Sequence, residues 1–548
     1  MEKIEALIMR KNRNLKNTSA KLKSAEAEIF PTGPLTIMLK FLRRRIKSII
    51  FKKNFKIIIL LLILIVASFL RLYKIDQYLI FLGDEGRDSL IVKRMIVDHK
   101  FTLLGPTASV GGFYLGPIYY YMMIIPTILA NFEPVGPAIM VALFGVITVF
   151  LIFIFLNQIW GPIPAIFAAL LYSFSPVVLE FSRFSWNPNS VPLFSLLLIW
   201  FLYQGSVSKM TRHFFLAGCC LGIALQLHYL TLILGPVTIA SILLTNNPRK
   251  SLKAIAFSFL GTLFTFSPFL AFEARHQFPN TKSLLEFITR SHGPIHGRHL
   301  NILFDFTQKS SLLFQETLNL NNLYFIVPLI IISLLLLINF LFKTKEKAIK
   351  KGTFIIFLWW ILGVGVLCFY RGRIIPHYLT YLFPLSTIIV GFLLWRIFQT
   401  IKIFGKLLSI LLLLSILFLQ IKGLYLWYSP NNQVKQTKEI SKTILNLTNS
   451  EPYNFALVSS GNSDHAYRYF LELWGKPPKT LEEEITGQLI VICEETCDIL
   501  GHPLWEIAGF GRAEIKEVIE GPVGIKIYKL IHHQESLNLI GQPVIKGK

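Results

Sequence analysis

The stretch Phe81-Leu82-Gly83-Asp84-Glu85-Gly86-Arg87-Asp88 begins about nine residues after the first long apolar run of the chain ends. Three carboxylates and one arginine therefore lie close to the end of a hydrophobic segment. A charged side chain at the bilayer centre costs roughly 2.5–3.5 kcal/mol, so we expect this cluster at the water interface. Gly83 and Gly86 flank the acidic pair and predict a flexible turn that a polar substrate could approach. A solvated loop is the alternative interpretation.

The composition indicates a membrane protein. Of the 548 residues 53% are hydrophobic, and the mean hydropathy is +0.55, which is too apolar for a soluble protein. Only 16% of the residues are charged, yet the formal net charge is +24. The lysines and arginines fall mostly between apolar runs, which is typical of membrane topology and not of a nucleic-acid-binding domain. We expect no cleavable signal peptide, because the N-terminal segment is long and polar.

Residues 1–54 form a strongly basic segment, which we expect on the cytoplasmic side. Within it, Leu39–Phe51 mixes basic and apolar residues and predicts a helix lying against anionic lipid. The basic lead-in to the first apolar run begins at Met38, so we expect translation to start there. Residues 55–430 are predicted to form a transmembrane domain, with residues 73–132 as its first outer loop.

Long apolar runs predict a polytopic α-helical membrane protein, because about 20 apolar residues are needed to cross a bilayer core. About eleven spans are predicted, at residues 55–72, 133–156, 161–180, 190–206, 213–228, 229–245, 254–271, 323–342, 353–370, 379–398 and 404–423. Residues 116–130 are aromatic and broken by Pro117 and Pro126, and they predict an interfacial or membrane-dipping helix.

The charge of the connections orients the predicted spans. With the N-terminus inside, all the inner loops are basic, as the positive-inside rule requires: Lys209–Arg212, Arg249–Lys253, Lys343–Lys351 and Lys402–Lys406. Counting residues 116–130 as a span would reverse every later loop and break the rule repeatedly. Eleven spans place the C-terminal segment outside, and the lack of organelle signals favours a multi-pass protein of the plasma membrane.

Residues 431–548 are less apolar and predict a small extracytoplasmic α/β domain. Strand-like patterns and one helical pattern with a Gly475 stop support this fold, at Asn454–Ser460, Gln488–Cys493 and Val523–Ile531 for the strands and at Asp464–Trp474 for the helix. Cys493 and Cys497 make a poor zinc signature, and a local disulfide between them is an alternative to two free thiols.

Four predicted outer segments carry polar residues that are costly to place near lipid: Asp84–Asp88, Phe181–Asn189, Phe272–His276 and Arg371–Tyr378. The candidate catalytic carboxylates are Asp84 and Glu85. The candidate donor-phosphate and substrate-binding residues are Arg87, Asp88, Arg183, Glu273, Arg275, His276, Arg371, Arg373, His377 and Tyr378. Behind the acidic turn, apolar positions alternate with Lys93 and Arg94, which predicts an amphipathic helix on the membrane.

Carboxylates on one segment and cations on three others suit the transfer of a group from a phosphate. The cations neutralise the phosphate leaving group, and a carboxylate removes a proton from the attacking hydroxyl. Taken singly, each cation has a structural alternative: Arg183 could anchor the chain at the interface, and Arg275 could extend along the lipid. No metal is required by this reading, although Asp84 and Asp88 also suit Mg²⁺ or Mn²⁺.

The order of these motifs resembles that of GT-C fold glycosyltransferases. One span, an outer loop that opens with an Asp-Glu pair, a membrane-lying helix and the Gly116–Tyr121 entry follow one another. The resemblance is narrower to the bacterial branch related to protein O-mannosyltransferases and to the aminoarabinose transferase that modifies lipid A. It covers roughly residues 55–400, and Ser175–Asn189, Ser267–Pro279 and His377-Tyr378 strengthen it.

The resemblance implies an inverting transfer from a polyprenyl-phosphate sugar to a glycan, lipid or protein acceptor. Asp84 aligns with the family's catalytic acidic residue, and Glu85 is the second acid of the pair. Phosphate contacts by Arg275, His276 and His377 are implied in the same way. Eukaryotic protein mannosyltransferases carry a large β-trefoil domain between two spans, and Glu273–Asn322 is too short for one. The rival interpretations are a transporter or flippase of lipid-linked sugars and a non-catalytic scaffold.

Overall fold

The computed structural model describes residues 56–108, 112–290, 301–370, 372–400 and 402–533. The predictions for residues 1–54, for Met38 and for Arg371 therefore lie outside the described residues. The chain divides into two compact units, Met1–Leu62 and Ile63–Lys548, and apart from residues 56–62 of the first helix the features below belong to the second.

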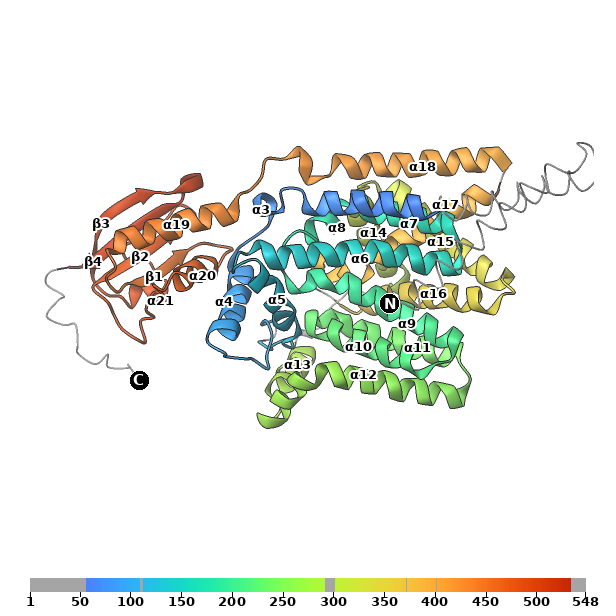
Figure 1. Cartoon of the computed structure of the whole chain (residues 1–548), viewed down its shortest axis with the longest axis horizontal. Coiled ribbons are helices and arrows are strands. Elements are labelled where there is room, and N and C mark those ends of the chain that lie inside the picture. The colour runs from blue at the N-terminus through green and yellow to red at the C-terminus, as the bar shows by residue number, and fades with distance from the viewer. Residues whose placement is uncertain (1–55, 109–111, 291–300, 371, 401, 534–548) are drawn as a thin grey trace, which may run out of the picture. The chain divides into compact units, whose positions relative to one another are not determined.

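Helices fill the second unit up to Trp427 (Figure 1). After a helix over residues 56–72, the order is α3 (Ile75–Tyr78), α4 (Gly83–Val97), α5 (Ile118–Leu129), α6 (Val135–Ile159), α7 (Pro162–Phe174), α8 (Pro176–Phe181), η1 (Asn187–Ser190), α9 (Val191–Ser208), α10 (Thr211–Leu227), η2 (Tyr229–Ile233), α11 (Leu234–Thr245), α12 (Pro248–Arg275), α13 (Pro279–Arg290), α14 (Ile302–Leu318), α15 (Leu323–Lys343), α16 (Lys347–Leu367), η3 (Pro376–Leu382), α17 (Phe383–Thr400), α18 (Lys402–Lys422) and η4 (Tyr425–Trp427).

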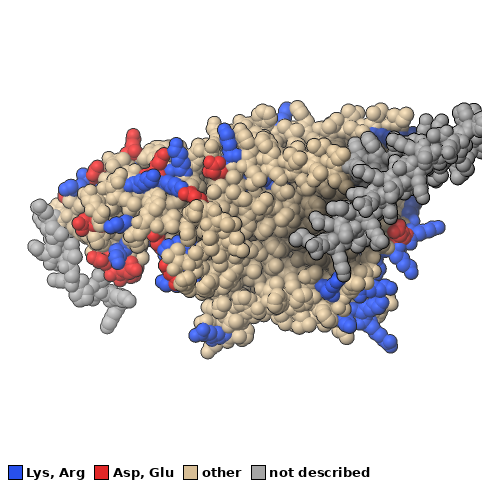
Figure 2. Space-filling view, in the orientation of Figure 1, with Lys and Arg blue, Asp and Glu red and all other residues tan. Residues whose placement is uncertain are grey.

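The long helices have the length and composition of membrane spans. Among the described residues, seven helices are long and apolar enough to cross a bilayer, and four further apolar helices are shorter. Large apolar side chains lie on the outside of several of them: Phe264 is 69% exposed and Phe342 is 82% exposed. Such exposure is favourable in lipid and unfavourable in water, so the protein is a multi-pass membrane protein. Figure 2 shows the same division, with charges sparse over the helices and concentrated towards their ends and over the C-terminal domain.

Each predicted span coincides with helical residues, but several are broken. The span predicted at 161–180 is divided into α7 and α8 at Ser175-Pro176, because a proline disfavours helical backbone in the residue before it. The stretch predicted at 116–130 forms α5, whose twelve residues extend roughly 18 Å, well short of a bilayer core of about 30 Å. The outer loop predicted at Glu273–Asn322 contains α14, which was not expected and which buries Leu313 and Phe314 completely.

The C-terminal domain is the small α/β fold that the sequence predicts. Its sheet has the order β1-β2-β4-β3, with β1 and β2 parallel and the other pairs antiparallel. The elements are α19 (Gln433–Thr448), β1 (Asn454–Val458), α20 (His465–Leu473), β2 (Gln488–Cys493), α21 (Trp505–Ala508), β3 (Ala513–Glu520), η5 (Pro522–Gly524) and β4 (Lys526–His532).

Burial explains which strands the sequence reveals. Every residue of the central strand β2 is buried, and its apolar run packs under α19 and α20 on one face of the sheet. The edge strand β3 was not predicted, because it is mostly exposed and alternates acidic residues with Lys516, as edge strands that resist aggregation do. A disulfide joins Cys493 at the end of β2 to Cys497.

Candidate active site

The acidic stretch forms the first turn of α4 and not the flexible turn that we predicted. Asp84 and Glu85 lie in this turn, where negative charge is favoured by the helix dipole. The Glu85 carboxylate accepts a hydrogen bond from the backbone N–H of Leu82 at 2.9 Å, so Glu85 closes the helix N-terminus. Glu85 is 6% exposed, and its first role is therefore to fix the turn that carries Asp84.

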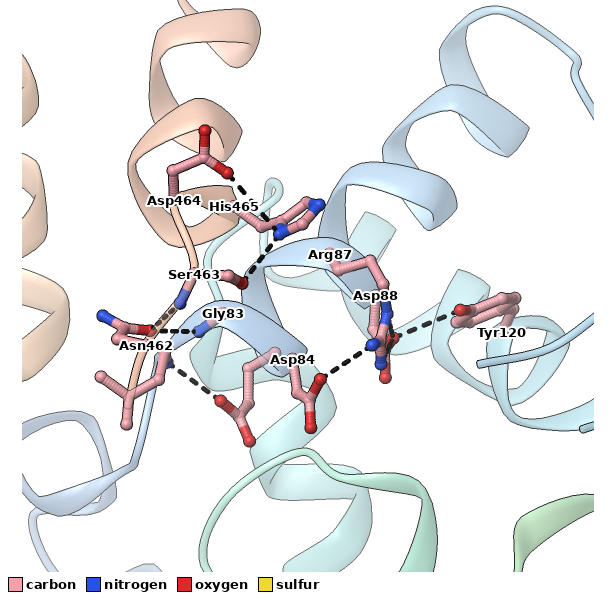
Figure 3. Close-up of polar contacts among 11 residues, drawn as sticks. Gly83, Asp84, Arg87, Asp88, Tyr120, Asn462, Ser463, Asp464 and His465 are labelled. Carbon is pink, nitrogen blue, oxygen red and sulfur yellow. Dashed lines mark hydrogen bonds and ion pairs between the residues drawn. The ribbon is translucent and has the colours of Figure 1, made fainter. Parts of the chain in front are cut away.

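Gly83 and Gly86 allow the C-terminal domain to pack directly on α4. Figure 3 shows Gly83 beside Asn462 and Ser463 of that domain. A Cβ atom at Gly86 would lie 2.5 Å from Ala466 Cα, and one at Gly83 would lie 2.9 Å from Ser463 N. The Gly83 N–H also donates to Asn462 Oδ1 at 2.9 Å. Both glycines have ordinary negative φ angles, so they are required by this close approach and not by a special backbone conformation.

Arg87 joins two carboxylates of the turn, as Figure 3 shows. Its guanidinium lies 2.7 Å from Asp84 Oδ1 and 2.8 Å from Asp88 Oδ1. Tyr120 Oη donates to the same Asp88 oxygen at 3.3 Å, whereas Asp88 Oδ2 has no hydrogen-bond partner among the described residues. The Asp88 side chain is fully buried and that of Asp84 is 48% exposed, so only Asp84 presents a carboxylate to a substrate.

Burial shifts the other two carboxyls of the turn. It raises the pKa of Glu85 to about 8. Burial also raises the pKa of Asp88 to about 6, against the opposing effect of the Arg87 guanidinium. Glu85 is therefore largely protonated near neutral pH, whereas the Arg87 guanidinium favours the charged form of Asp88.

Two cavities meet at Asp84. The larger, of about 480 Å³, is lined by Asp84, Trp186 and the loop Ser460–Ser463 of the C-terminal domain. The smaller, of about 30 Å³, is lined by Asp84 and Trp186 together with Arg87 and several aromatic residues. Asp84 and Trp186 thus separate two parts of one site: the larger cavity, which the C-terminal domain helps to line, and the smaller cavity, which residues of the helical part line.

An aromatic cluster forms the wall of the smaller cavity. The His377 ring lies 4.7 Å from the Trp186 ring and 4.6 Å from the Tyr378 ring, between centroids. His228 packs 5.5 Å from Tyr378 and 4.7 Å from Tyr229. The structure therefore brings together three of the four predicted outer segments: those of Asp84 and His377, and that of Arg183, which reaches the cavity through Trp186.

His228 and Tyr229 were not predicted, and they take the place that we gave to the Glu273 segment. His228 follows the end of α10 and Tyr229 begins η2, where the two predicted spans 213–228 and 229–245 meet. The predicted topology puts this junction on the same face as Asp84. A histidine and a tyrosine in a tight outer turn were the signal that could have revealed them.

Arg183 has partners other than the predicted phosphate. It donates to the backbone carbonyls of Leu70 at 3.0 Å, Arg71 at 2.9 Å and Tyr73 at 2.9 Å. Its guanidinium also lies 3.7 Å from the centroid of the Tyr425 ring. These carbonyls end the helix over residues 56–72, so Arg183 neutralises a helix C-terminus.

The Glu273 segment lies apart from the two cavities. Glu273 is buried and accepts four hydrogen bonds from Asn280 and Thr281, so it caps the N-terminus of α13. Arg275 and His276 are exposed at the end of α12, and neither lines a cavity that contains Asp84. Arg373 is likewise exposed and outside both cavities.

The basic side chains of α4 also meet the C-terminal domain, where we expected lipid. Arg94 forms a bidentate pair with Glu472 of α20 at 2.6 and 3.1 Å, and Lys93 lies 3.3 Å from the same carboxylate. The apolar face of α4 is buried through Leu90 and Met95. The helix is amphipathic as predicted, but its polar face binds protein.

Comparison with known proteins gives one family match. Residues 115–272 match the model of a family described as dolichyl-phosphate-mannose-protein mannosyltransferase. This match starts after Asp84 and covers α5 to most of α12. No curated protein sequence matches the chain at a significant level.

Solved structures match nearly the whole fold. ArnT from Cupriavidus metallidurans bound to undecaprenyl phosphate is 12% identical with a TM-score of 0.57, over 86% of this chain and 97% of that chain. The apo form of ArnT gives the same identity and TM-score over 87% and 98%. The archaeal oligosaccharyltransferase AglB from Archaeoglobus fulgidus, in complex with an inhibitory peptide and a dolichol-phosphate, is 12% identical with a TM-score of 0.51, over 90% and 75%. The chain therefore has the GT-C fold of these membrane glycosyltransferases.

Proposed function

We propose that this GT-C protein is a membrane glycosyltransferase that moves a sugar from a polyprenyl-phosphate donor to an acceptor hydroxyl. The observation that carries the proposal is the position of Asp84, a half-exposed carboxylate on a fixed helical turn that faces both cavities. The fold agrees with a lipid-linked donor, because the matching ArnT structure contains undecaprenyl phosphate and the AglB structure contains a dolichol-phosphate.

In the proposed reaction Asp84 accepts the proton of the acceptor hydroxyl. The freed oxygen attacks the anomeric carbon from the face opposite the phosphate, the bond from that carbon to the phosphate oxygen breaks, and the polyprenyl phosphate leaves with the bonding electrons. A single displacement of this kind inverts the anomeric configuration. A positioned general base contributes roughly 10²–10⁴-fold to such a step.

Arg87 is the cation that we assign to the leaving phosphate, and His377 and Tyr378 are the neighbouring polar groups. Arg87 lines the smaller cavity beside them, and a guanidinium fits phosphate oxygens in a bidentate way. The cavity of about 30 Å³ is too small for a sugar phosphate, so its lining must move when the donor binds. We propose that no metal is needed, because Arg87 already supplies positive charge between Asp84 and Asp88.

We place the site on the extracytoplasmic side of the plasma membrane. The basic loops at Lys209–Arg212 and Lys343–Lys351 come at the ends of α9 and α15. Counted along the predicted spans, both loops fall on the side of the membrane opposite Asp84. By the positive-inside rule these loops are cytoplasmic, so the N-terminus is cytoplasmic and the C-terminal domain is outside.

The test is cleavage of labelled polyprenyl-phosphate sugars by the full-length protein in nanodiscs. Asp84→Asn should lower turnover by roughly 10²–10⁴-fold with the protein still folded. Asp76→Asn, an exposed carboxylate on α3, is the matched control and should retain full turnover. Full activity of Asp84→Asn would refute the assignment, and movement of intact donor across vesicles without cleavage would favour a flippase. A chelator should leave turnover unchanged.

A further inference from the structure

The described residues that line the larger cavity carry no positive charge. Its polar lining consists of Asp84, Glu85 and the loop Ser460–Ser463, and its apolar lining of Ile80, Leu82, Phe184 and Trp186. Among these described lining residues there is no lysine, arginine or histidine. The smaller cavity, on the other side of Asp84, contains Arg87 and His377. The two sides of Asp84 are therefore built for ligands of different charge.

We propose that the larger cavity is the acceptor site, that the Ser460–Ser463 loop forms its wall, and that the acceptor presents the hydroxyl of an uncharged carbohydrate. This inference rests on the proposed glycosyltransferase function and names the substrate class that the function leaves open.

The charge of the lining excludes a phosphorylated acceptor. An anion in the cavity would lie beside the Asp84 carboxylate, and the described lining residues supply no cation to meet it, because Arg87 lines only the smaller cavity and already pairs with Asp84 and Asp88. An uncharged sugar instead fits a wall of hydroxyl and backbone groups opposite an indole. Its C–H face can stack on Trp186, while Ser460 offers a hydroxyl group to its oxygens. The Ser463 hydroxyl is already hydrogen-bonded to His465 Nδ1 at 2.9 Å.

The loop is held in place before any acceptor arrives. Asn462 Oδ1 accepts from the Gly83 and Ser463 N–H groups, each at 2.9 Å. Its Nδ2 donates to Glu494 at 3.0 Å, next to the Cys493–Cys497 disulfide. A wall fixed in this way loses little conformational entropy when a ligand binds.

The position of the loop in the sheet supports the same role independently. Ser460–Ser463 connects β1 to α20, and β1 lies parallel to β2, so the loop follows the carboxyl end of a parallel strand. In α/β sheets ligands bind at this end, where the loops are free to contact them. Here that end is turned towards α4, because the Gly83 N–H is bonded to Asn462.

Gly461 allows the site to be filled without damage to the fold. A Cβ atom at Gly461 would have nothing within 4 Å, and its φ angle is not in the left-handed region. Gly461→Trp should therefore place an indole in the cavity. Gly487→Trp is the matched control, since Gly487 is exposed in the same domain, is equally unobstructed and does not line the cavity.

The experiment uses the full-length protein in nanodiscs with two probes, an uncharged alkyl glucoside that carries a photoreactive diazirine and its 6-phosphate. Crosslinked peptides are mapped by mass spectrometry, and glycosylated probe is quantified when a cleavable donor is present. We expect crosslinks of the uncharged probe at residues 460–463 or at Trp186. We expect at least tenfold weaker labelling by the phosphate, and at least a tenfold higher acceptor KM in Gly461→Trp, with donor KM unchanged.

The outcomes separate this inference from the function on which it rests. Equal labelling by the phosphorylated probe would overturn the charge argument, and an unchanged acceptor KM in Gly461→Trp with an unchanged crosslink would overturn the placement of the acceptor. Donor cleavage that depends on Asp84, together with crosslinks elsewhere, would refute only the acceptor site. Crosslinks at residues 460–463 without cleavage of any donor would refute only the transferase reaction.

Discussion

The substitution Gly86→Ala tests whether the glycines of the acidic turn serve the C-terminal domain or the substrate. The new Cβ would lie 2.3 Å from Ala466 N, whereas ordinary contact begins at 3.4 Å, so α20 must withdraw by about 1.1 Å. The same movement would stretch the 2.9 Å bond from Gly83 N–H to Asn462 beyond hydrogen-bonding range. Overpacking of this kind costs about 1–3 kcal/mol.

A loss of about 1–3 kcal/mol corresponds to a roughly 5–150-fold rise in the population in which α20 has separated from α4. Hydrogen exchange of the backbone amides in α20 reports this population directly. We expect exchange at the N-terminal end of α20 to accelerate by that factor in Gly86→Ala and donor cleavage to fall. Gly487→Ala, where a Cβ meets nothing within 4 Å and which lines neither cavity at Asp84, should leave both unchanged. Lost cleavage with unchanged exchange in α20 would show instead that Gly86 serves the substrate.

Two further variants test the roles that the structure gives to predicted site residues. Burial raises the Glu85 pKa from the ordinary 4.5 to about 8, so its contribution to folding is complete below pH 4.5 and is lost as the pH rises through about 8. Glu85→Gln keeps an acceptor for the Leu82 N–H and cannot ionise. Its thermal unfolding midpoint should therefore fall less between pH 5 and 9 than that of the wild type. An equal fall in both proteins would contradict this. Arg183→Met removes three charged hydrogen bonds and should lower the free energy of unfolding by at least about 1.5 kcal/mol with donor KM unchanged, whereas a raised donor KM at unchanged stability would restore the phosphate role.

The sequence predicts the fold well, because the strongest signals are local. Apolar runs of about 20 residues mark spans wherever no proline interrupts them, and the buried strand β2 was predicted at its observed bounds, Gln488–Cys493. The predictions failed where tertiary contacts override local pattern. Helix α14 carries Asp305, Lys309 and Glu316 within its turns, so its hydropathy resembled that of a loop even though its apolar side packs among the spans.

The site is harder to predict from the sequence than the fold. A charged residue near a membrane can bind a substrate, but it can equally bind backbone groups at a helix end. Arg183 and Glu273 are polar residues that we predicted on the same side of the membrane as Asp84. In the structure, Arg183 binds carbonyls at the end of the first helix, and Glu273 caps the N-terminus of α13. Both use charge to satisfy backbone groups that a helix leaves unpaired. Asp84 and His377, by contrast, do meet at one cavity.

The C-terminal domain determines where Asp84 lies, through contacts that no local pattern can reveal. The segment that leads from α3 into the acidic turn is bonded to this domain at three residues before Asp84. Gln77 accepts from the Asn432 N–H at 2.8 Å, Phe81 N–H donates to Gln433 at 2.9 Å, and Gly83 bonds Asn462 across 379 positions of sequence. The two glycines that suggested a mobile turn are therefore the points at which a second domain approaches and immobilises it. A general base must be held in one orientation to accept a proton, and these contacts hold the turn that carries Asp84. The Ser460–Ser463 loop, which makes the contact with Gly83, also lines the larger cavity beside Asp84.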